Sequence, residues 1–268
     1  MEFSIITVNY NNKEGLKKTI ESVEGLSSNN YEFIIIDGGS TDGSVNVIKE
    51  HQSSISFWVS EKDDGIYNAM NKGIRQAKGE YINFMNSGDT YYTPNVLSIV
   101  EKELKGYDIV VGKEFHQNPQ TGATATTFLP MRLSMATFVV SFLPHQGGFI
   151  RRTLFNDMLY DESLKIVSDW KFYMLQTVYK NRKVKLINTI ICQREQGGIS
   201  NTGTNLNKEE RKQVLNALLP PGICKDYESL SRLDKTTMYK LLNLCDDSKC
   251  RKYLTYCIKI IYRIKKYL

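Results

Sequence analysis

Residues 31–43 of the 268-residue chain read YEFIIIDGGSTDG, a nearly continuous apolar run that ends in a polar, glycine-rich loop. An uninterrupted apolar run of this length is typical of a strand that is buried on both faces of a parallel sheet. The loop is followed by a helical pattern that carries Val45 and Ile48. A buried strand, a loop and a helix in this order form the repeating unit of an α/β protein.

The same alternation of short β-rich runs and helical patterns fills the first half of the chain. Upstream, a strand at 3–8 precedes a helix whose apolar residues Leu16, Ile20 and Val23 recur at helical spacing. Downstream, the pattern predicts strands at 57–60, 81–85 and 108–111 and helices at 66–77 and 94–104. We therefore predict a single Rossmann-like, mostly parallel sheet flanked by helices.

The second half of the chain is less regular. Residues 113–143 are rich in Thr, Gly and Pro and predict a loop with short strands or turns. Strands are expected at 147–150 and 184–192, a helix at 169–180, and further helices from 207 onward with a break at Pro220 and Pro221. We predict a domain at 1–205, with a nucleotide-binding half at about 1–112 and an acceptor half at about 113–205, and a helical C-terminal extension at 206–268.

Composition excludes several classes of protein. A chain that is 41% hydrophobic and 24% charged is typical of a globular protein. Five cysteines without C-x-x-C spacing fit a reducing compartment and argue against a structural zinc. The start lacks a basic leader, and no run of 18 apolar residues occurs, so we expect a cytoplasmic protein.

The formal charge of +6 is concentrated at the C-terminus. Residues 251–268 contain no acid and carry Arg251, Lys252, Lys259, Arg263, Lys265 and Lys266. A neutral body with a basic tail argues against nucleic acid as a partner. On a helix, most of these cations lie opposite an apolar side, which predicts peripheral binding to an anionic membrane at its inner face. The alternative is a helix that packs on the domain with its basic side in solvent.

Four polar clusters follow the predicted strands. They are Thr7 to Asn11, Asp37 to Asp42, Glu61 to Gly65, and Asn86 to Asp89. Ordinary turn and cap chemistry explains any one of them, but ligands of a parallel sheet bind at this edge. The edge is mainly acidic, so a diphosphate would need a bridging cation such as Mg²⁺, for which Asp89 is the candidate ligand. Neither a P-loop nor a dinucleotide-binding motif is present.

Together, these clusters and the stretch SEKDDGIYNAMNKG at 60–73 resemble glycosyltransferase family 2, in particular bacterial members that build surface polysaccharides. The resemblance is dense over residues 1–112 and continues in short islands to about residue 200. It implies a GT-A fold and transfer of a hexosyl or N-acetylhexosaminyl group, with inversion, from a nucleotide-sugar, usually a UDP-sugar. The implied acceptor is a hydroxyl group of a lipid-linked or growing cell-surface glycan.

The resemblance also implies the residues of a donor site. The positions that match the family's donor pocket are Thr7, Asn9, Asp37, Asp63, Asn71, Asn86, Ser87 and Gly88. Asp89 matches the last carboxylate of the family's D-x-D motif, which holds Mn²⁺ or Mg²⁺. The sequence departs from the motif because Ser87 replaces its first carboxylate, which leaves the choice of metal open.

Three islands carry the remaining expectations. His145 and Gln146 match the acceptor side, although spacing alone favours an ordinary loop histidine at 145. Asp169, followed by Trp170 on the acceptor side, matches the catalytic base, although Ser168 as an N-cap and Asp169 in the first helical turn are favourable by themselves. Gly197, Gly198 and Ser200 match a loop beside the diphosphate, with Arg194 as a phosphate contact; the alternative is a simple glycine turn.

Two other functions remain open at this point. A sugar nucleotidyltransferase would share the nucleotide-binding sheet, but residues 7–15 lack the Gly-rich, basic loop that such enzymes carry. A non-catalytic member that binds nucleotide-sugar or scaffolds a polysaccharide assembly complex would fit the loss of a carboxylate at Ser87. The presence of both Asp89 and Asp169 opposes that alternative.

Overall fold

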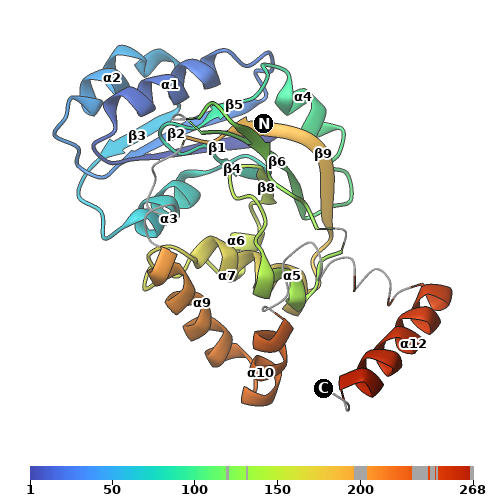
Figure 1. Cartoon of the computed structure of the whole chain (residues 1–268). Coiled ribbons are helices and arrows are strands. Elements are labelled where there is room, and N and C mark those ends of the chain that lie inside the picture. Colours follow the sequence, from blue (N-terminus) through green and yellow to red (C-terminus); the bar gives the residue numbers. More distant parts are fainter. Residues whose placement is uncertain are drawn as a thin grey trace. The chain divides into compact units, whose positions relative to one another are not determined.

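The computed structural model describes residues 1–118, 121–130, 132–195, 204–230, 241, 245 and 247–265. Their strands form one 9-stranded sheet in the order β3-β2-β1-β4-β8-β6-β9-β5, with β7 paired to β6 (Figure 1). The strands are β1 (Phe3–Asn9), β2 (Tyr31–Asp37), β3 (Phe57–Ser60), β4 (Tyr81–Phe84), β5 (Thr90–Tyr91), β6 (Ile109–Gln117), β7 (Thr124–Thr126), β8 (Gly148–Arg151) and β9 (Val184–Gln193).

The predicted mostly parallel sheet is confirmed. Strands β1, β2, β3 and β4 pair in parallel, and β6 and β9 run in the same direction as these four. Strands β5, β7 and β8 run the opposite way. Because the parallel strands share a direction, their carboxyl ends meet at one edge, where the polar clusters of the sequence lie.

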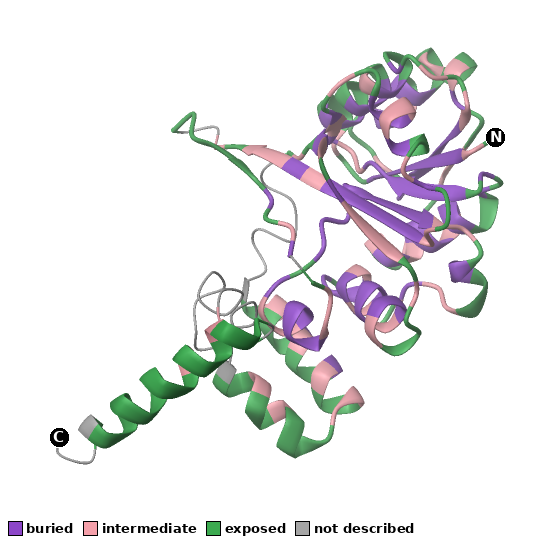
Figure 2. Cartoon of the chain, turned by 90° about the vertical axis from the view of Figure 1, so that its right-hand side faces the viewer, coloured by how far each residue is buried: buried purple, intermediate pink, exposed green. Residues whose placement is uncertain are grey.

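One face of the sheet is covered by α1 (Lys13–Glu24), α2 (Ser44–Glu50) and α4 (Val96–Glu101). Phe3 and Ile5 of β1 pack there against Leu16 and Ile20 of α1 in the main hydrophobic core. The other face receives α3 (Ile66–Gln76), whose Gly73 lies so close to Ile6 that an added Cβ would be 2.5 Å from Ile6 Cγ2. All seven residues of β1 are buried, as expected for a strand covered on both faces (Figure 2).

The second face also carries α6 (Leu154–Asp157) and α7 (Ser168–Met174), which is extended by a π-helical turn, η2 (Leu175–Tyr179). An aromatic cluster fills the space next to β4. Phe84 stacks on His145 at 4.9 Å between ring centroids, and Phe155 stacks on Phe172 at 4.6 Å. The remaining short helix, η1 (Gln52–Ser54), follows α2.

Two local predictions differ from the structure. Residues 113–117 continue β6, because they pair with β9 on one side and with β7 on the other. Residues 135–140, also predicted as loop, form α5 (Met135–Val140), which begins with a capping box between Ser134 and Thr137.

The predicted N-cap at Ser168 is wrong. Val167 occupies that position, and Ser168 is the first helical residue, with its hydroxyl accepting a hydrogen bond from the Asp161 N–H at 2.6 Å. Asp169 does lie in the first turn of α7, as predicted.

The chain forms two compact units, one of Met1–Leu129 and Phe142–Val214, the other of Pro130–Ser141 and Leu215–Leu268. The sheet belongs to the first unit, as does most of α9 (Thr204–Leu218). The second contains α5, α10 (Pro221–Leu230) and α12 (Ser248–Lys265), and Tyr227 packs there against Ala136. The domain boundary predicted between residues 205 and 206 stays a prediction. No helix of the described part of the chain is long and apolar enough to cross a membrane.

Candidate active site

A cavity of about 1200 Å³ lies within the first unit, at the carboxyl ends of β1 and β4. The carboxylate residues Asp89 and Asp169 both line it, although they are far apart in the sequence. The other predicted site residues in its wall are Asn9, Asp63, Asn86, Ser87, His145, Gln146, Trp170 and Arg194. Such a volume exceeds the usual size of a small-molecule pocket, so the cavity has room for two substrates.

Four of the predicted donor-binding residues are not part of the cavity wall: Thr7, Asp37, Asn71 and Gly88. Thr7 donates its hydroxyl proton to Met85 O at 2.6 Å and so joins the ends of β1 and β4. The side-chain amide of Asn71 donates to Tyr160 O and accepts from the Tyr160 N–H, and so it ties α3 to the segment before α7. The buried contacts of these two side chains give them a structural role, and direct contact with a donor stays a prediction. Gly197, Gly198 and Ser200 lie outside the described residues.

Asp37 is a fully buried carboxylate whose acceptor positions are used within the protein. It accepts hydrogen bonds from Asn9 Nδ2 at 2.7 Å, from the Ser40 hydroxyl at 2.6 Å and N–H at 2.9 Å, and from the Ser60 hydroxyl at 2.6 Å. Burial alone would raise the pKa of Asp37, but the hydrogen bonds from Ser40, Ser60 and Asn9 outweigh it and hold the pKa below its usual value. The ionised carboxylate orients Asn9, a residue of the cavity wall whose buried Oδ1 makes no hydrogen bond.

The turn from Asn86 to Asp89 is fixed to the beginning of α1. The Gly88 N–H donates to the Thr19 hydroxyl at 2.9 Å, and that hydroxyl donates to Asp89 O at 2.8 Å. Gly88 has a φ of 101°, a conformation that favours glycine. Ser87, at the position where the sequence lacks a carboxylate, donates its hydroxyl proton to Asn12 O at 3.2 Å.

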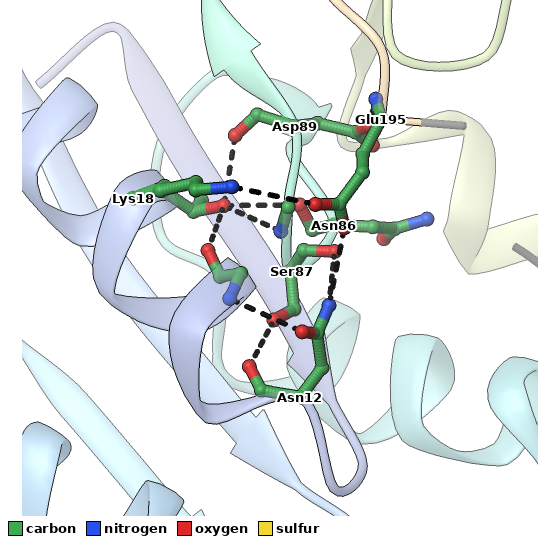
Figure 3. A network of polar contacts seen from close by, with 9 residues as sticks. Asn12, Lys18, Asn86, Ser87, Asp89 and Glu195 are labelled. Atoms are coloured by element: carbon green, nitrogen blue, oxygen red, sulfur yellow. Dashed lines mark hydrogen bonds and ion pairs between the residues drawn. The ribbon is translucent and has the colours of Figure 1, made fainter. Parts of the chain in front are cut away.

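Figure 3 shows that Glu195 reaches the same turn from the end of β9. Its carboxylate lies against Gly88, 3.3 Å from Asn12 Nδ2 and 3.7 Å from Lys18 Nζ. A carboxylate therefore does stand next to the serine of this turn, although it comes from a distant part of the sequence.

Asp89 is buried, and both its oxygens accept hydrogen bonds, from Gln146 Nε2 at 3.0 Å and from the Glu195 N–H at 2.9 Å. Burial, assisted by the nearby Glu114 carboxylate, raises the pKa of Asp89 to about 7. The pKa is raised although the Arg194 charge opposes the rise, and a bound cation would lower it.

Asp169 lies at the start of α7, where the Tyr67 hydroxyl is 2.7 Å from its Oδ1 and 2.6 Å from Ile166 O. Burial and then the Asp169 charge raise the pKa of Tyr67 well above its usual value, so Tyr67 stays a proton donor. The hydrogen bond fixes one carboxylate oxygen of Asp169.

Residues 4–159, more than half of the chain, match the model of Glycosyl transferase family 2. The chain belongs to glycosyltransferase family 2. An uncharacterised glycosyltransferase of Mycobacterium tuberculosis is 29% identical over 184 residues, which cover 64% of this chain and 67% of the relative.

Among solved structures, TarS 1-349 of S. aureus in complex with UDP-GlcNAc superposes with a TM-score of 0.64 at 16% identity, covering 90% of this chain and 76% of that chain. The mannosyltransferase PcManGT from Pyrobaculum calidifontis, in complex with GDP-Man and Mn²⁺, gives a TM-score of 0.62 at 12% identity over 97% of this chain and 80% of that one. These likenesses show a shared fold and confirm the predicted GT-A fold. The chain spans 45% of the length of the longer TarS chain that it matches.

The family's metal fits this glycosyltransferase if the substrate completes the coordination. The described residues contain no group of three or more His, Cys, Asp or Glu that could hold a metal ion. Asp89 is the one carboxylate that the sequence predicts as a metal ligand. Mg²⁺ typically takes one or two carboxylates together with phosphate oxygens and water. The raised pKa of Asp89 and the buried Asn86 Oδ1, which lacks a hydrogen bond, both fit a nearby cation.

The three residues predicted on the acceptor side of this glycosyltransferase have different environments. His145 is buried, bonds the Tyr160 hydroxyl at 2.9 Å, and has a pKa lowered by burial, so it is neutral at pH 7. Gln146 contacts Asp89 and therefore lies at the metal end. Trp170 packs under Arg211, whose guanidinium carbon is 4.9 Å from the ring centroid. Contact of these residues with an acceptor stays a prediction.

Several residues of the glycosyltransferase site were missed by sequence reasoning. Arg211 and Asn207 of α9 line the cavity, and Glu210 accepts hydrogen bonds from three consecutive backbone N–H groups, at Lys165, Ile166 and Val167. Glu210 is buried one helical turn before the buried Val214, and a glutamate in this charged helix carries no sequence signal of that burial. Tyr10 and Glu114 also line the cavity without having been assigned a role.

Proposed function

We propose that this protein is an inverting, metal-dependent glycosyltransferase that moves a sugar from a nucleoside diphosphate sugar to a hydroxyl group. The observation that carries the proposal is the single cavity that Asp89 and Asp169 share. The two carboxylates have the two environments that this reaction needs. Asp89 is buried where a cation would compensate its charge, and Asp169 is oriented by a tyrosine toward the open space.

The nucleobase fits next to Asn9. Its unpartnered Oδ1 accepts a hydrogen bond, and the imide N–H of uracil is a suitable donor. Tyr10, 70% exposed, and Asp63 both lie next to Gly38, where an added Cβ would be 3.2 Å from Tyr10 Cδ2 and 3.1 Å from Asp63 Oδ2. A base can stack on the tyrosine ring while the carboxylate accepts hydrogen bonds from ribose. This chemistry favours a UDP-sugar, the donor type present in the TarS complex.

The reaction follows from the placement of Asp169. Its free carboxylate oxygen accepts the proton of the acceptor hydroxyl as that oxygen attacks the anomeric carbon. The bond between this carbon and the phosphate oxygen breaks, the nucleoside diphosphate leaves from the opposite side, and the configuration inverts. Asp89 would hold Mn²⁺ or Mg²⁺, which would supply Lewis-acid stabilisation of the leaving diphosphate. No covalent intermediate forms.

The acceptor is a lipid-linked or growing glycan, and α12 holds the enzyme on an anionic membrane surface at the cytoplasmic side. Support comes from the side chains of this helix. Its Tyr253, Tyr262 and Ile261 are 74%, 74% and 62% exposed, and its last turn carries Arg263 and Lys265. Exposed aromatic and aliphatic residues beside cations are typical of helices that lie in a membrane interface.

The test is a screen of the purified protein against UDP-, GDP- and dTDP-sugars with Mn²⁺ or Mg²⁺. We expect one donor to raise the melting temperature and to release its nucleoside diphosphate, with inversion visible by NMR in the product. Asp169→Asn should bind that donor normally but turn over roughly 10² to 10⁴ times more slowly. Asp157→Asn, at an exposed ion pair, is the control. Release of pyrophosphate would identify a nucleotidyltransferase instead, and full turnover by Asp169→Asn would refute the assignment of the base.

A further inference from the structure

Glu114 of β6 is a buried carboxylate that the proposed mechanism does not use. The residue is 1% exposed and forms part of the cavity wall. Neither of its oxygens accepts a hydrogen bond from a described side chain. An uncompensated buried carboxylate strongly destabilises a fold, so its retention points to a ligand that completes it.

The backbone around Glu114 is shaped to place this side chain in the wall. The pairing of β6 with β9 changes register between Val111 and Lys113 and again between Lys113 and Glu114, and such irregularities redirect side chains. Gly112 makes the close packing possible, because an added Cβ would lie 2.4 Å from Ile191 Cγ1. The Gly112 N–H donates to Gly147 O at 2.9 Å and so holds the turn with His145 and Gln146 beside Glu114.

His116, the nearest histidine in the chain, does not compensate the charge of Glu114. His116 Nε2 lies 3.6 Å from Glu114 Oε2, which is too far for a hydrogen bond, and it contacts the Thr127 hydroxyl at 3.0 Å instead. Burial lowers the pKa of His116, so the ring is uncharged at pH 7. Burial raises the pKa of Glu114 to about 7, although the Arg194 charge and the Gln146 and Gly147 amides oppose that rise.

Glu114 lines the same cavity as the two functional carboxylates, Asp89 and Asp169. The Glu114 charge raises the pKa of Asp89, and the Asp169 charge raises the pKa of Glu114. In an in-line displacement, the group between the leaving diphosphate and the base is the sugar that is transferred. A sugar offers several hydroxyl donors, and some sugars also an acetamido N–H, to a wall that presents an acceptor.

We infer that Glu114 binds the transferred sugar and selects it, by accepting hydrogen bonds from its hydroxyl groups or its acetamido N–H. The inference rests on the proposed function, since it names what occupies the sugar position of that site. A nucleotide-sugar without an O–H or N–H group at the contacted carbon leaves the carboxylate buried and unpaired. The enzyme therefore rejects that nucleotide-sugar.

The experiment compares UDP with the UDP-sugar that the wild-type protein binds most tightly, by titration calorimetry with Mn²⁺ at pH 8. Glu114→Gln should bind the UDP-sugar about 10- to 100-fold more weakly, the usual effect of losing a charged hydrogen bond, and should bind UDP as the wild type does. Glu114→Asp, which keeps the charge on a shorter side chain, should recover part of the loss. Glu50→Gln, on the exposed end of α2, is the control.

Each other outcome overturns the inference. Equal weakening of UDP and UDP-sugar would mean that Glu114 supports the diphosphate, its cation or the fold. Unchanged binding of both ligands would mean that Glu114 does not contact the sugar. If the wild-type protein bound no nucleotide-sugar at all, the proposed function itself would be wrong. That outcome is distinct from a failure of the Glu114 inference alone, in which the wild-type protein still binds a nucleotide-sugar.

Discussion

Glu114 makes the stability of the free protein depend on pH in a direction opposite to that of most carboxylates. Its pKa in the folded protein is about 7, against 4.5 in the unfolded chain. Below pH 4.5 the residue is protonated in both states and costs nothing. Between pH 4.5 and 7 the folded state retains a proton that the unfolded state releases, so the free energy of unfolding falls as pH rises. The difference of about 2.5 pKa units corresponds to about 3 kcal/mol at pH 8.

Glu114→Gln removes this effect. We expect the variant to be similar to the wild type near pH 4.5 and more stable at pH 8, by roughly 6 to 12 °C in melting temperature. Thermal melts of ligand-free protein at several pH values check this, with Glu50→Gln as the exposed control. A variant that melts below the wild type at pH 8 would show that Glu114 has stabilising partners in the fold, and the reasoning from its burial would be refuted.

Three further predictions concern the metal, the base and the tail. Asp89→Asn should abolish the gain in UDP affinity that Mn²⁺ gives over EDTA, as measured by calorimetry; an intact response to Mn²⁺ would place the cation elsewhere. Glu210→Gln should lower stability by about 1–3 kcal/mol and slow turnover, because it frees the segment before Asp169. The control Glu209→Gln, at an exposed residue, should do neither. Equal melting temperatures of the two variants would contradict the role of Glu210 in holding that segment. Deletion of 251–268 should release the enzyme from vesicles that contain phosphatidylserine, since each basic residue contributes about 1 kcal/mol, and undiminished sedimentation with the vesicles would contradict it.

The parallel part of the fold was predictable because its strands have a recognisable pattern in the sequence. In β2 the apolar run from Phe33 to Ile36 is buried on both faces, which only a covered parallel strand requires. Strand β6 was predicted too short, because Lys113, Glu114 and His116 are polar. Those residues form a strand because β9 and β7 supply hydrogen bonds from distant parts of the sequence, and a local pattern does not report such pairing.

The candidate site was predictable where chain topology determines it. Asn9, Asn86 and Asp89 meet because parallel strands bring their carboxyl ends together. Asp169 reaches the same cavity only through the packing of α7, and the family resemblance, rather than any spacing, pointed to it. Glu210 was beyond prediction, since a glutamate in a charged helix reads as exposed until three backbone N–H groups of another segment are found on it.

Several buried acceptors of the cavity wall lack a hydrogen bond from a described side chain, which argues for the nature of the ligand. Asn9 Oδ1, Asn86 Oδ1 and both oxygens of Glu114 accept no hydrogen bond from a described side chain, and Asp89 has a pKa raised by burial. A ligand that completes this wall must bring hydrogen-bond donors along its length and positive charge at the Asp89 end. A nucleotide-sugar with a divalent cation does both: the base offers an N–H, the sugar offers hydroxyls, and the cation joins the diphosphate to Asp89. A simple phosphate or a nucleoside alone would leave part of the wall unpaired. The distribution of unpaired acceptors from Asn9 to Glu114 therefore favours the complete donor over any fragment of it.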